Sequence, residues 1–376
     1  VLIAIGVLYL VSALGSALAL DPWSFSFWRF VGGLGVGISS IAAPAYISEI
    51  APPAVRGRLV ALYQFQIVFG ILVAYLSNFG LTTALALDWR WMLGIEALPA
   101  LAYLLLVVRV PESPRWLLLR RDDEVEARRV LASIDAEGVE RTIREIRHAE
   151  GEFTGNRIFA RAYLFPVMLA FLIAAFNQLS GINFIIYFAP RVFELAGLES
   201  SAALLSSAGV GVVNLIFTMI GLWLIDRAGR RTLMLAGSIG YIFSLAAVTW
   251  AFANDVGGIV VVAFVFLFIA SHAVGQGAVI WVFIAEIFPN NVRTKGQSIG
   301  CGTHWVFAAV ITLLMPYFIG LFDAQTIFGF FTAMMVLQLL FVLFVMPETK
   351  GSSLERLAER LSEHAGGALE STQPAD

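Results

Sequence analysis

Carboxamide side chains interrupt an apolar run between Asn177 and Tyr187, which reads Asn-Gln-Leu-Ser-Gly-Ile-Asn-Phe-Ile-Ile-Tyr. Residues 170–173 before it and 184–186 within it have the composition of a membrane-spanning helix. At that depth each polar group without a partner costs several kcal/mol. Amides both donate and accept hydrogen bonds without carrying charge, so these side chains suit a neutral polar ligand or a contact between helices.

The composition of the whole chain explains why such residues are unusual. Hydrophobic residues make up 59% of the 376 positions and charged residues only 14%, and the mean hydropathy is +0.84. These values, with repeated apolar runs of about 20 residues, indicate a polytopic membrane protein and exclude a soluble domain. The net charge of −3 gives no support to a nucleic-acid partner.

Metal and redox chemistry find little support in the sequence. The single cysteine, Cys301, excludes an internal disulfide and a cysteine metal cluster, and four scattered histidines do not suggest a metal site. We therefore expect neither a metal nor another cofactor. No nucleophile and base stand at a spacing typical of an enzyme, so we do not expect enzymatic activity.

Apolar periodicity and length divide the chain into membrane-spanning segments. Ten spans are predicted, at residues 1–20, 27–47, 59–78, 89–109, 162–187, 203–225, 232–252, 259–283, 297–320 and 325–346.

Positive charge is distributed unevenly between these spans. Of the 24 Lys and Arg residues, 21 lie in or beside residues 48–58, 109–161, 226–231, 293–295 and 347–376. The positive-inside rule places these segments in the cytoplasm. The long polar stretch within them, 111–161, has sparse apolar residues that fit either short amphipathic helices or a solvated linker.

An internal repeat relates the two ends of the chain. Ser48-Glu49-Ile50-Ala51-Pro52 recurs as Ala285-Glu286-Ile287-Phe288-Pro289, and Pro111-Glu112 recurs as Pro347-Glu348, at nearly the same separation. The repeat predicts two homologous halves of six spans in the same orientation, with two helices of the first half preceding residue 1. The expected divisions are 1–110 for the first half, 111–161 for a cytoplasmic linker, 162–346 for the second half and 347–376 for a cytoplasmic tail.

The motifs, taken together and in order, resemble the sugar porter family of the major facilitator superfamily. The resemblance runs from about residue 1 to Glu355. It rests on Arg29 with Gly32, Gly33, Gly35 and Gly37, on Pro44-Ala45-Tyr46-Ile47-Ser48-Glu49 with Arg56-Gly57-Arg58, on Pro111-Glu112-Ser113-Pro114-Arg115-Trp116-Leu117, on Gln178-Leu179-Ser180-Gly181-Ile182-Asn183, on Asp226-Arg227-Ala228-Gly229-Arg230-Arg231, on Glu286 with Arg293, and on Pro347-Glu348-Thr349-Lys350-Gly351. The family implies an all-α membrane protein with the major facilitator fold, which consists of two parallel-related six-helix bundles. The ten predicted spans would be helices three to twelve of these twelve.

The same resemblance implies a sugar site. The positions that match the family's binding residues, or lie beside them, are Gln64, Asn177, Gln178, Asn183, Tyr187, Asn214, Trp281 and Trp305. The alternative is that these amides only tie helices together. In a straight helix Gln178 and Asn183 point about 140° apart, so a shared ligand requires a bend, for which Ser180-Gly181 is suited.

Charged residues on the predicted cytoplasmic side resemble the family's gate, which latches the two halves and releases as the protein turns inward. They are Glu49, Arg56, Glu112, Arg115, Arg227, Arg230, Arg231, Glu286, Arg293 and Glu348. The alternative is that basic loops only fix the orientation of the chain.

Two charges lie within the spans themselves. Arg29 and Glu96 resemble the proton-coupling residues of bacterial members, and a titratable acid beside an arginine can exchange a proton for its partner. A purely structural ion pair is the alternative. Departures from the family include Gly275-Gln276-Gly277 in place of prolines, and histidines at His272 and His304.

These observations lead to one expected function and several alternatives. We expect monosaccharide transport by alternating access, coupled to proton symport, in a multi-pass monomer of the cell inner (cytoplasmic) membrane. The expected partners are the sugar, the proton and the lipid bilayer. A facilitative hexose or polyol uniporter and a sugar sensor that does not transport are the alternatives.

Overall fold

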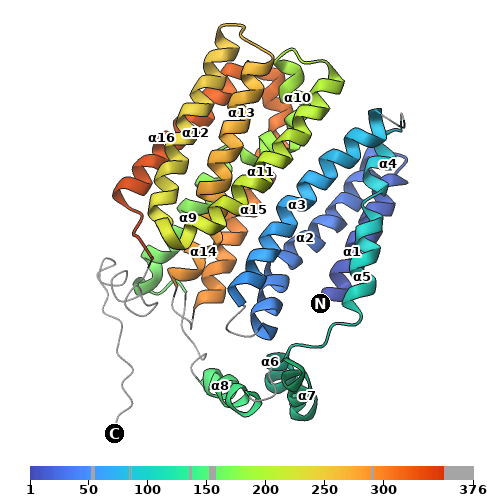
Figure 1. The fold of residues 1–376 in the computed structure, drawn as a ribbon, viewed down its shortest axis with the longest axis vertical. Coiled ribbons are helices and arrows are strands. Elements are labelled where there is room, and N and C mark those ends of the chain that lie inside the picture. Colours follow the sequence, from blue (N-terminus) through green and yellow to red (C-terminus); the bar gives the residue numbers. More distant parts are fainter. Residues whose placement is uncertain are drawn as a thin grey trace. The chain divides into compact units, whose positions relative to one another are not determined.

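The computed structural model describes residues 1–51, 56–83, 85, 87–134, 138–151, 158–288 and 292–350. The regular elements assigned in this part of the chain are all helices (Figure 1). They fall into two compact units, residues 1–154 and 155–376, which are described separately below.

The first unit contains four long helical segments and a group of short helices. Its elements are α1 (Leu2–Ala17), α2 (Pro22–Ile50), α3 (Arg56–Thr83), α4 (Trp89–Gly94), α5 (Ala97–Val107), α6 (Pro114–Trp116), the π-helix η1 (Leu117–Arg121), α7 (Glu124–Ile134) and α8 (Val139–Gly151). Helix α1 packs against α2, α4 and α5, and α3 packs against α2 and α4. Gly32 allows α1 and α2 to approach closely, because an added Cβ would lie 2.3 Å from Ser12 Oγ.

Helix α2 begins where the sequence provides a capping box. Asp21 Oδ1 accepts hydrogen bonds from the backbone N–H groups of Trp23 and Ser24 at 2.9 and 3.0 Å, and Pro22 occupies the first helical turn. These hydrogen bonds, those from Ser24 above all, lower the pKa of the Asp21 carboxyl. The cap fixes the start of the helix that carries Arg29 and Glu49.

The short helices α7 and α8 form a small core of their own. Val130 and Leu131 of α7 are buried with Ile143 of α8 and Leu117 of η1. On the polar side, Glu124 accepts a hydrogen bond from Arg128 at 2.6 Å and pairs with Arg147 of α8. The hydrogen bond with Arg128 is the main cause of the lowered pKa of Glu124.

The second unit is a larger helical bundle. Its elements are the 3₁₀-helix η2 (Arg161–Tyr163), α9 (Leu164–Leu179), α10 (Ile182–Leu195), α11 (Ser200–Ala228), α12 (Arg230–Ala253), α13 (Ile259–His272), the π-helix η3 (Ala273–Gly277), α14 (Ala278–Glu286), α15 (Arg293–Leu321) and α16 (Ala324–Phe344). Helix α12 lies beside α13 and α16, and α9 lies beside α15 (Figure 1).

Apolar side chains from several of these helices meet in one core. Leu169 and Ile173 of α9, Met234 of α12, Phe283 of α14 and Val342 of α16 are all fully buried within it. By contrast, large apolar side chains on the outside of the helices remain exposed, as expected where lipid replaces water.

The predicted spans agree with the observed helices. Nine helical segments within the described residues are long and apolar enough to cross a membrane. The tenth, expected at residues 1–20, corresponds to α1, which has 16 residues. The prediction of an all-α membrane protein is thereby confirmed.

Candidate functional site

The predicted bend between Gln178 and Asn183 is present. Helix α9 ends at Leu179 and α10 begins at Ile182, with Gly181 between them at a φ of +82°. Only glycine adopts this left-handed conformation without strain, and a Cβ on Gly181 would also lie 2.7 Å from the Phe331 ring. The break brings the two amides together, because Asn183 Nδ2 donates to Gln178 Oε1 at 2.9 Å.

The amides continue as a chain into the interior of the second unit. Gln178 Nε2 donates to Asn177 Oδ1 at 3.0 Å, and Asn177 Nδ2 donates to Gln276 Oε1 at 3.2 Å. Gln276 Nε2 then donates to Gln338 Oε1 at 2.6 Å. Asn177, Gln178, Gln276 and Gln338 are all buried, whereas Asn183 is only half-buried. The half-buried end of the chain is therefore the end that can meet a ligand.

Aromatic side chains surround that end. The ring nitrogens of His304 lie 3.1 and 3.2 Å from Gln178 Nε2. Next to His304 stand Trp281, with ring centroids 5.0 Å apart, and Trp305, with centroids 5.2 Å apart. The indole of Trp281 is partly exposed. Amides for hydroxyl groups and an indole for the C–H face of a ring are what a sugar requires.

The other three predicted binding residues are on α11, α10 and α3. Asn214 on α11 is buried and accepts a hydrogen bond from Thr218 of its own helix at 3.4 Å. Tyr187 on α10 is exposed by 55%. Gln64 lies on α3 of the first unit. Their roles in binding stay predictions.

The amide chain continues to α12, where Gln338 Nε2 donates to Ser238 Oγ at 2.8 Å. The buried residues Gln276, Gln338 and Ser238 were not among the predicted site residues. Gln276 belongs to η3, the π-helix that occupies the position where the family has prolines. Gln338 stands in the apolar span 325–346, where an isolated amide carries the same cost that drew attention to Asn177. The cost of burying an isolated amide could therefore have marked Gln338 as a candidate site residue. Nothing in the sequence distinguishes Ser238 from other serines in helices.

The predicted coupling pair lies within the first unit. Arg29 Nη1 of α2 and Glu96 Oε2, at the residue before α5, are 3.5 Å apart. About half of each side chain is exposed, 47% for Arg29 and 51% for Glu96. The geometry suits both interpretations of the pair, proton exchange and structural support.

In the second unit, the predicted gate residues form a compact charge cluster. Glu286 accepts two hydrogen bonds from the Arg230 guanidinium, at 2.7 and 3.1 Å, and a third from Thr349 Oγ1 at 2.6 Å. Glu348 accepts from the backbone N–H groups of Arg230 and Arg231, each at 3.0 Å. Glu348 thus caps the start of α12, where a negative charge is favourable.

The remaining basic residues of this cluster contact backbone or aromatic groups. Arg231 donates to the carbonyls of Val342 and Leu343, and Arg227 donates to Trp223 O and lies 4.1 Å above the Trp223 ring. Arg293 Nε donates to Phe288 O at 3.3 Å. Arg293 makes further interactions besides this one.

In the first unit, three of the four predicted gate residues, Glu49, Glu112 and Arg115, lie near the start of α6. Ser113 Oγ donates to Glu49 Oε2, and Tyr46 Oη donates to the Pro111 carbonyl at 2.6 Å. Glu112 lies near enough to act on Tyr46 electrostatically, and Arg115 is part of α6. Arg56 begins α3, but its side chain lies outside the described part of the chain.

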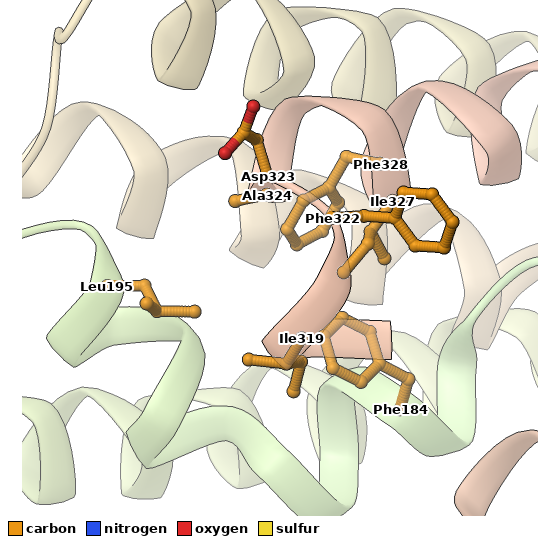
Figure 2. Close-up of a pocket in the computed structure, with 8 residues that line it drawn as sticks. All are labelled: Phe184, Leu195, Ile319, Phe322, Asp323, Ala324, Ile327 and Phe328. Carbon is orange, nitrogen blue, oxygen red and sulfur yellow. The ribbon is translucent and has the colours of Figure 1, made fainter. Parts of the chain in front are cut away.

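Two further features of the described residues bear on the site. A cavity of about 190 Å³ lies between the end of α10 and the α15–α16 connection, lined mainly by apolar side chains with Asp323 at its edge (Figure 2). None of its lining residues belongs to the amide chain. Among the described residues, no group of three or more His, Cys, Asp or Glu side chains is placed to hold a metal ion.

Comparison with known proteins identifies the family. The model of the "Sugar (and other) transporter" family matches residues 1–361. The D-xylose-proton symporter of Escherichia coli strain K12 is 34% identical over 348 residues, covering 89% of this chain and 70% of the relative. The arabinose-proton symporter of Bacillus subtilis is 33% identical, covering 95% and 79%. The glucose facilitated diffusion protein of Zymomonas mobilis is 34% identical, covering 92% and 75%.

Solved structures agree with the sequence matches. The inward-open xylose transporter of E. coli superposes with a TM-score of 0.81 at 30% identity, covering 95% of this chain and 81% of the other. The same transporter bound to 6-bromo-6-deoxy-D-glucose gives 0.77 at 32% identity, covering 95% and 82%. Both the predicted fold and the predicted transporter class, rather than an enzyme, are confirmed. The chain belongs to the sugar transporter family of the major facilitator superfamily.

Proposed function

We propose that this protein carries a monosaccharide across the cytoplasmic membrane by alternating access, together with a proton. The observation that carries the proposal is the half-buried end of the amide chain, where Asn183, Gln178 and His304 meet beside the Trp281 indole. Polar groups at this depth are costly unless they bind something, and a sugar supplies hydroxyl groups that match them.

The identity of the relatives supports the class of substrate. Proteins named for D-xylose, arabinose and glucose transport are each 30–34% identical to this chain. Pentoses and hexoses present similar hydroxyl patterns, so the amides alone do not select one of them. The substrate class proposed here is therefore a pentose or hexose monosaccharide.

Coupling to protons rests on the Arg29–Glu96 pair. In the protonated state Glu96 is neutral and its attraction to Arg29 is lost, so protonation and release change the interactions of both helices that carry them. Such a charge change supplies the differential interaction that a two-state transporter needs. Facilitated diffusion is the second candidate, because the Z. mobilis glucose facilitator is as similar as the symporters.

The cluster around Glu286 supports the alternating-access step. Its ion pair with Arg230 joins α12 to the end of α14, and Thr349 joins the segment after α16 to the same carboxylate. Charges held this way form a unit that can be intact in one state and separated in another. We propose that this cluster belongs to the cytoplasmic gate.

Uptake into proteoliposomes tests transport and coupling together. D-Xylose, arabinose and D-glucose are offered outside vesicles whose interior is more alkaline than the medium. Symport predicts accumulation of one of these sugars above the outside concentration, and collapse of that accumulation by a protonophore. Uptake that stops at equal concentrations and ignores the gradient supports facilitated diffusion. Absence of uptake for all three sugars contradicts the proposal.

A further inference from the structure

The buried amide chain has a fixed end. Ser238 of α12 is fully buried, and its hydroxyl donates to the Met234 carbonyl at 2.7 Å. A carbonyl only accepts, and a hydroxyl has one proton, so that proton is committed to Met234. The Ser238 oxygen can therefore meet Gln338 only as an acceptor, and the Gln338 atom 2.8 Å away must be the donor Nε2.

This choice passes from amide to amide. Because Gln338 directs Nε2 to Ser238, its Oε1 faces Gln276, and Gln276 must donate to it from Nε2. Gln276 then presents Oε1 to Asn177, and Asn177 presents its carbonyl to Gln178. Each amide has one donor end and one acceptor end, so no member can turn around without opposing two donors or two acceptors.

The chain ends at the proposed sugar site. Gln178 Oε1 accepts from Asn183 Nδ2, which leaves Asn183 Oδ1 as the free end of the sequence of hydrogen bonds. No described residue donates a hydrogen bond to this oxygen. Because Asn183 is half-buried, its carbonyl can accept from a ligand hydroxyl.

We propose that Ser238, Gln338 and Gln276 are positioning residues, which fix the orientation of the sugar-site amides so that Asn183 offers a carbonyl acceptor to a sugar hydroxyl. The inference rests on the proposed sugar binding. It adds the direction of one hydrogen bond: the sugar donates and the protein accepts. None of the three positioning residues needs to contact the sugar.

The direction of that hydrogen bond is measurable with sugar analogues. A deoxy analogue lacks the hydroxyl, and a deoxyfluoro analogue replaces it with an atom that accepts weakly and cannot donate. If Asn183 offers a carbonyl, both analogues lose the interaction to the same extent, about tenfold in affinity for one hydrogen bond. If Asn183 offered Nδ2, the fluoro analogue would retain part of the affinity that the deoxy analogue loses.

The test measures equilibrium dissociation constants for the purified full chain by calorimetry. The parent sugar is the best binder among D-xylose, arabinose and D-glucose, and each of its hydroxyls is replaced in turn by hydrogen and by fluorine. In the unaltered protein, at least one position must show a large and equal loss for both analogues. A fluoro analogue that binds severalfold better than its deoxy counterpart at every sensitive position overturns the proposal.

Variants far from the sugar then test the positioning role. Gln338→Leu and Ser238→Ala remove the fixed end of the amide chain, so both orientations of the Asn183 amide become populated. In these variants the fluoro analogue should bind about threefold more tightly than the deoxy analogue altered at the same position. Gln338→Glu keeps the direction, because its neutral carboxyl donates to Ser238 Oγ and accepts from Gln276 Nε2, and its ionised carboxylate still only accepts from Gln276 while the Ser238 proton turns to it. That variant should therefore preserve the equal losses.

Ser244→Ala is the matched control. Ser244 is also buried on α12, and its hydroxyl also donates to carbonyls of its own helix, those of Gly240 and Tyr241, but no side-chain amide among the described residues donates to it as Gln338 does to Ser238. A merely structural role for Ser238 predicts that both serine variants weaken all sugars equally and leave the analogue ratio unchanged, which would overturn the proposal. If Gln338→Leu fails to fold, Ser238→Ala and Gln338→Glu decide the question. Failure of all three parent sugars to bind the unaltered protein refutes the proposed function itself, a result separate from any change in ratio.

Discussion

Replacing Gly181 by alanine should damage the sugar site through the backbone alone. Gly181 is at a φ of +82°, where alanine carries a strain of about 1–2 kcal/mol. The new Cβ would also meet three atoms of the Phe331 ring at 2.7, 2.8 and 2.9 Å. Crowding of this kind in a packed interior costs about 1–3 kcal/mol more.

Both costs disappear if the chain straightens through this point. A continuous helix would turn Gln178 and Asn183 about 140° apart and break their hydrogen bond of 2.9 Å. In the Gly181→Ala protein the straightened, unstrained conformation, which cannot bind sugar, is therefore favoured over the bent one that can. A combined penalty of about 2–5 kcal/mol on the binding-competent form lowers the apparent sugar affinity by roughly 30-fold or more.

Gly197 provides the control for backbone strain. It has a φ of +90°, but nothing lies within 4 Å of an added Cβ, and it follows α10 rather than preceding it. Gly197→Ala should thus carry the strain without the crowding and leave sugar affinity close to that of the unaltered protein. Sugar affinity is measured by calorimetry in detergent, with thermal stability recorded for both variants. If Gly181→Ala binds sugar as tightly as Gly197→Ala does, the link between the break and the site is refuted.

Three further changes test other parts of the account. Glu286→Ala removes the carboxylate that accepts two hydrogen bonds from Arg230 and leaves Arg230 with Asp226, 3.1 Å away, so transport should fall severalfold while sugar binding from outside persists; unchanged transport in proteoliposomes contradicts a gating role. Glu96→Gln should abolish sugar-driven alkalinisation of the medium but keep sugar exchange; intact proton uptake removes Glu96 from the coupling step. The Glu124 pair stabilises α7 and α8 above the ordinary glutamate pKa and is lost as pH falls through the lowered pKa, so amide exchange in α8 should accelerate in acid relative to α9; Glu124→Gln should remove that dependence, and equal pH profiles for both proteins would contradict it.

Much of the fold follows from the sequence, because lipid leaves the backbone little choice. An apolar run of about 20 residues must satisfy its own hydrogen bonds, and a helix does so locally. The same reasoning located the break at Ser180-Gly181, since two amides five residues apart cannot share a ligand on a straight helix. Element boundaries were less certain because polar caps, such as the one at Asp21, extend helices beyond their apolar portion.

The partners of the amides could not be read from the sequence. Helical periodicity gives the face on which Asn177 lies, but not that Gln276, 99 positions later, meets it. The π-helix at 273–277 turns Gln276 inward, and a local change of pitch leaves no periodic pattern in five residues. The apolar sequence around Gln338 makes this amide conspicuous. Its partner Ser238 could not be predicted, because their contact depends on how α12 and α16 pack against each other.

The measurement that bears most directly on the central claim is counterflow of labelled sugar in proteoliposomes at equal pH on both sides. Vesicles loaded with unlabelled D-xylose, arabinose or D-glucose are diluted into a trace of the same labelled sugar. A carrier predicts transient accumulation of label in vesicles with the unaltered protein, and a severe loss of that accumulation with Gln178→Ala, which removes the amide shared by Asn177, Asn183 and His304. No counterflow for any of these sugars, or full counterflow in the Gln178→Ala protein, would contradict the account.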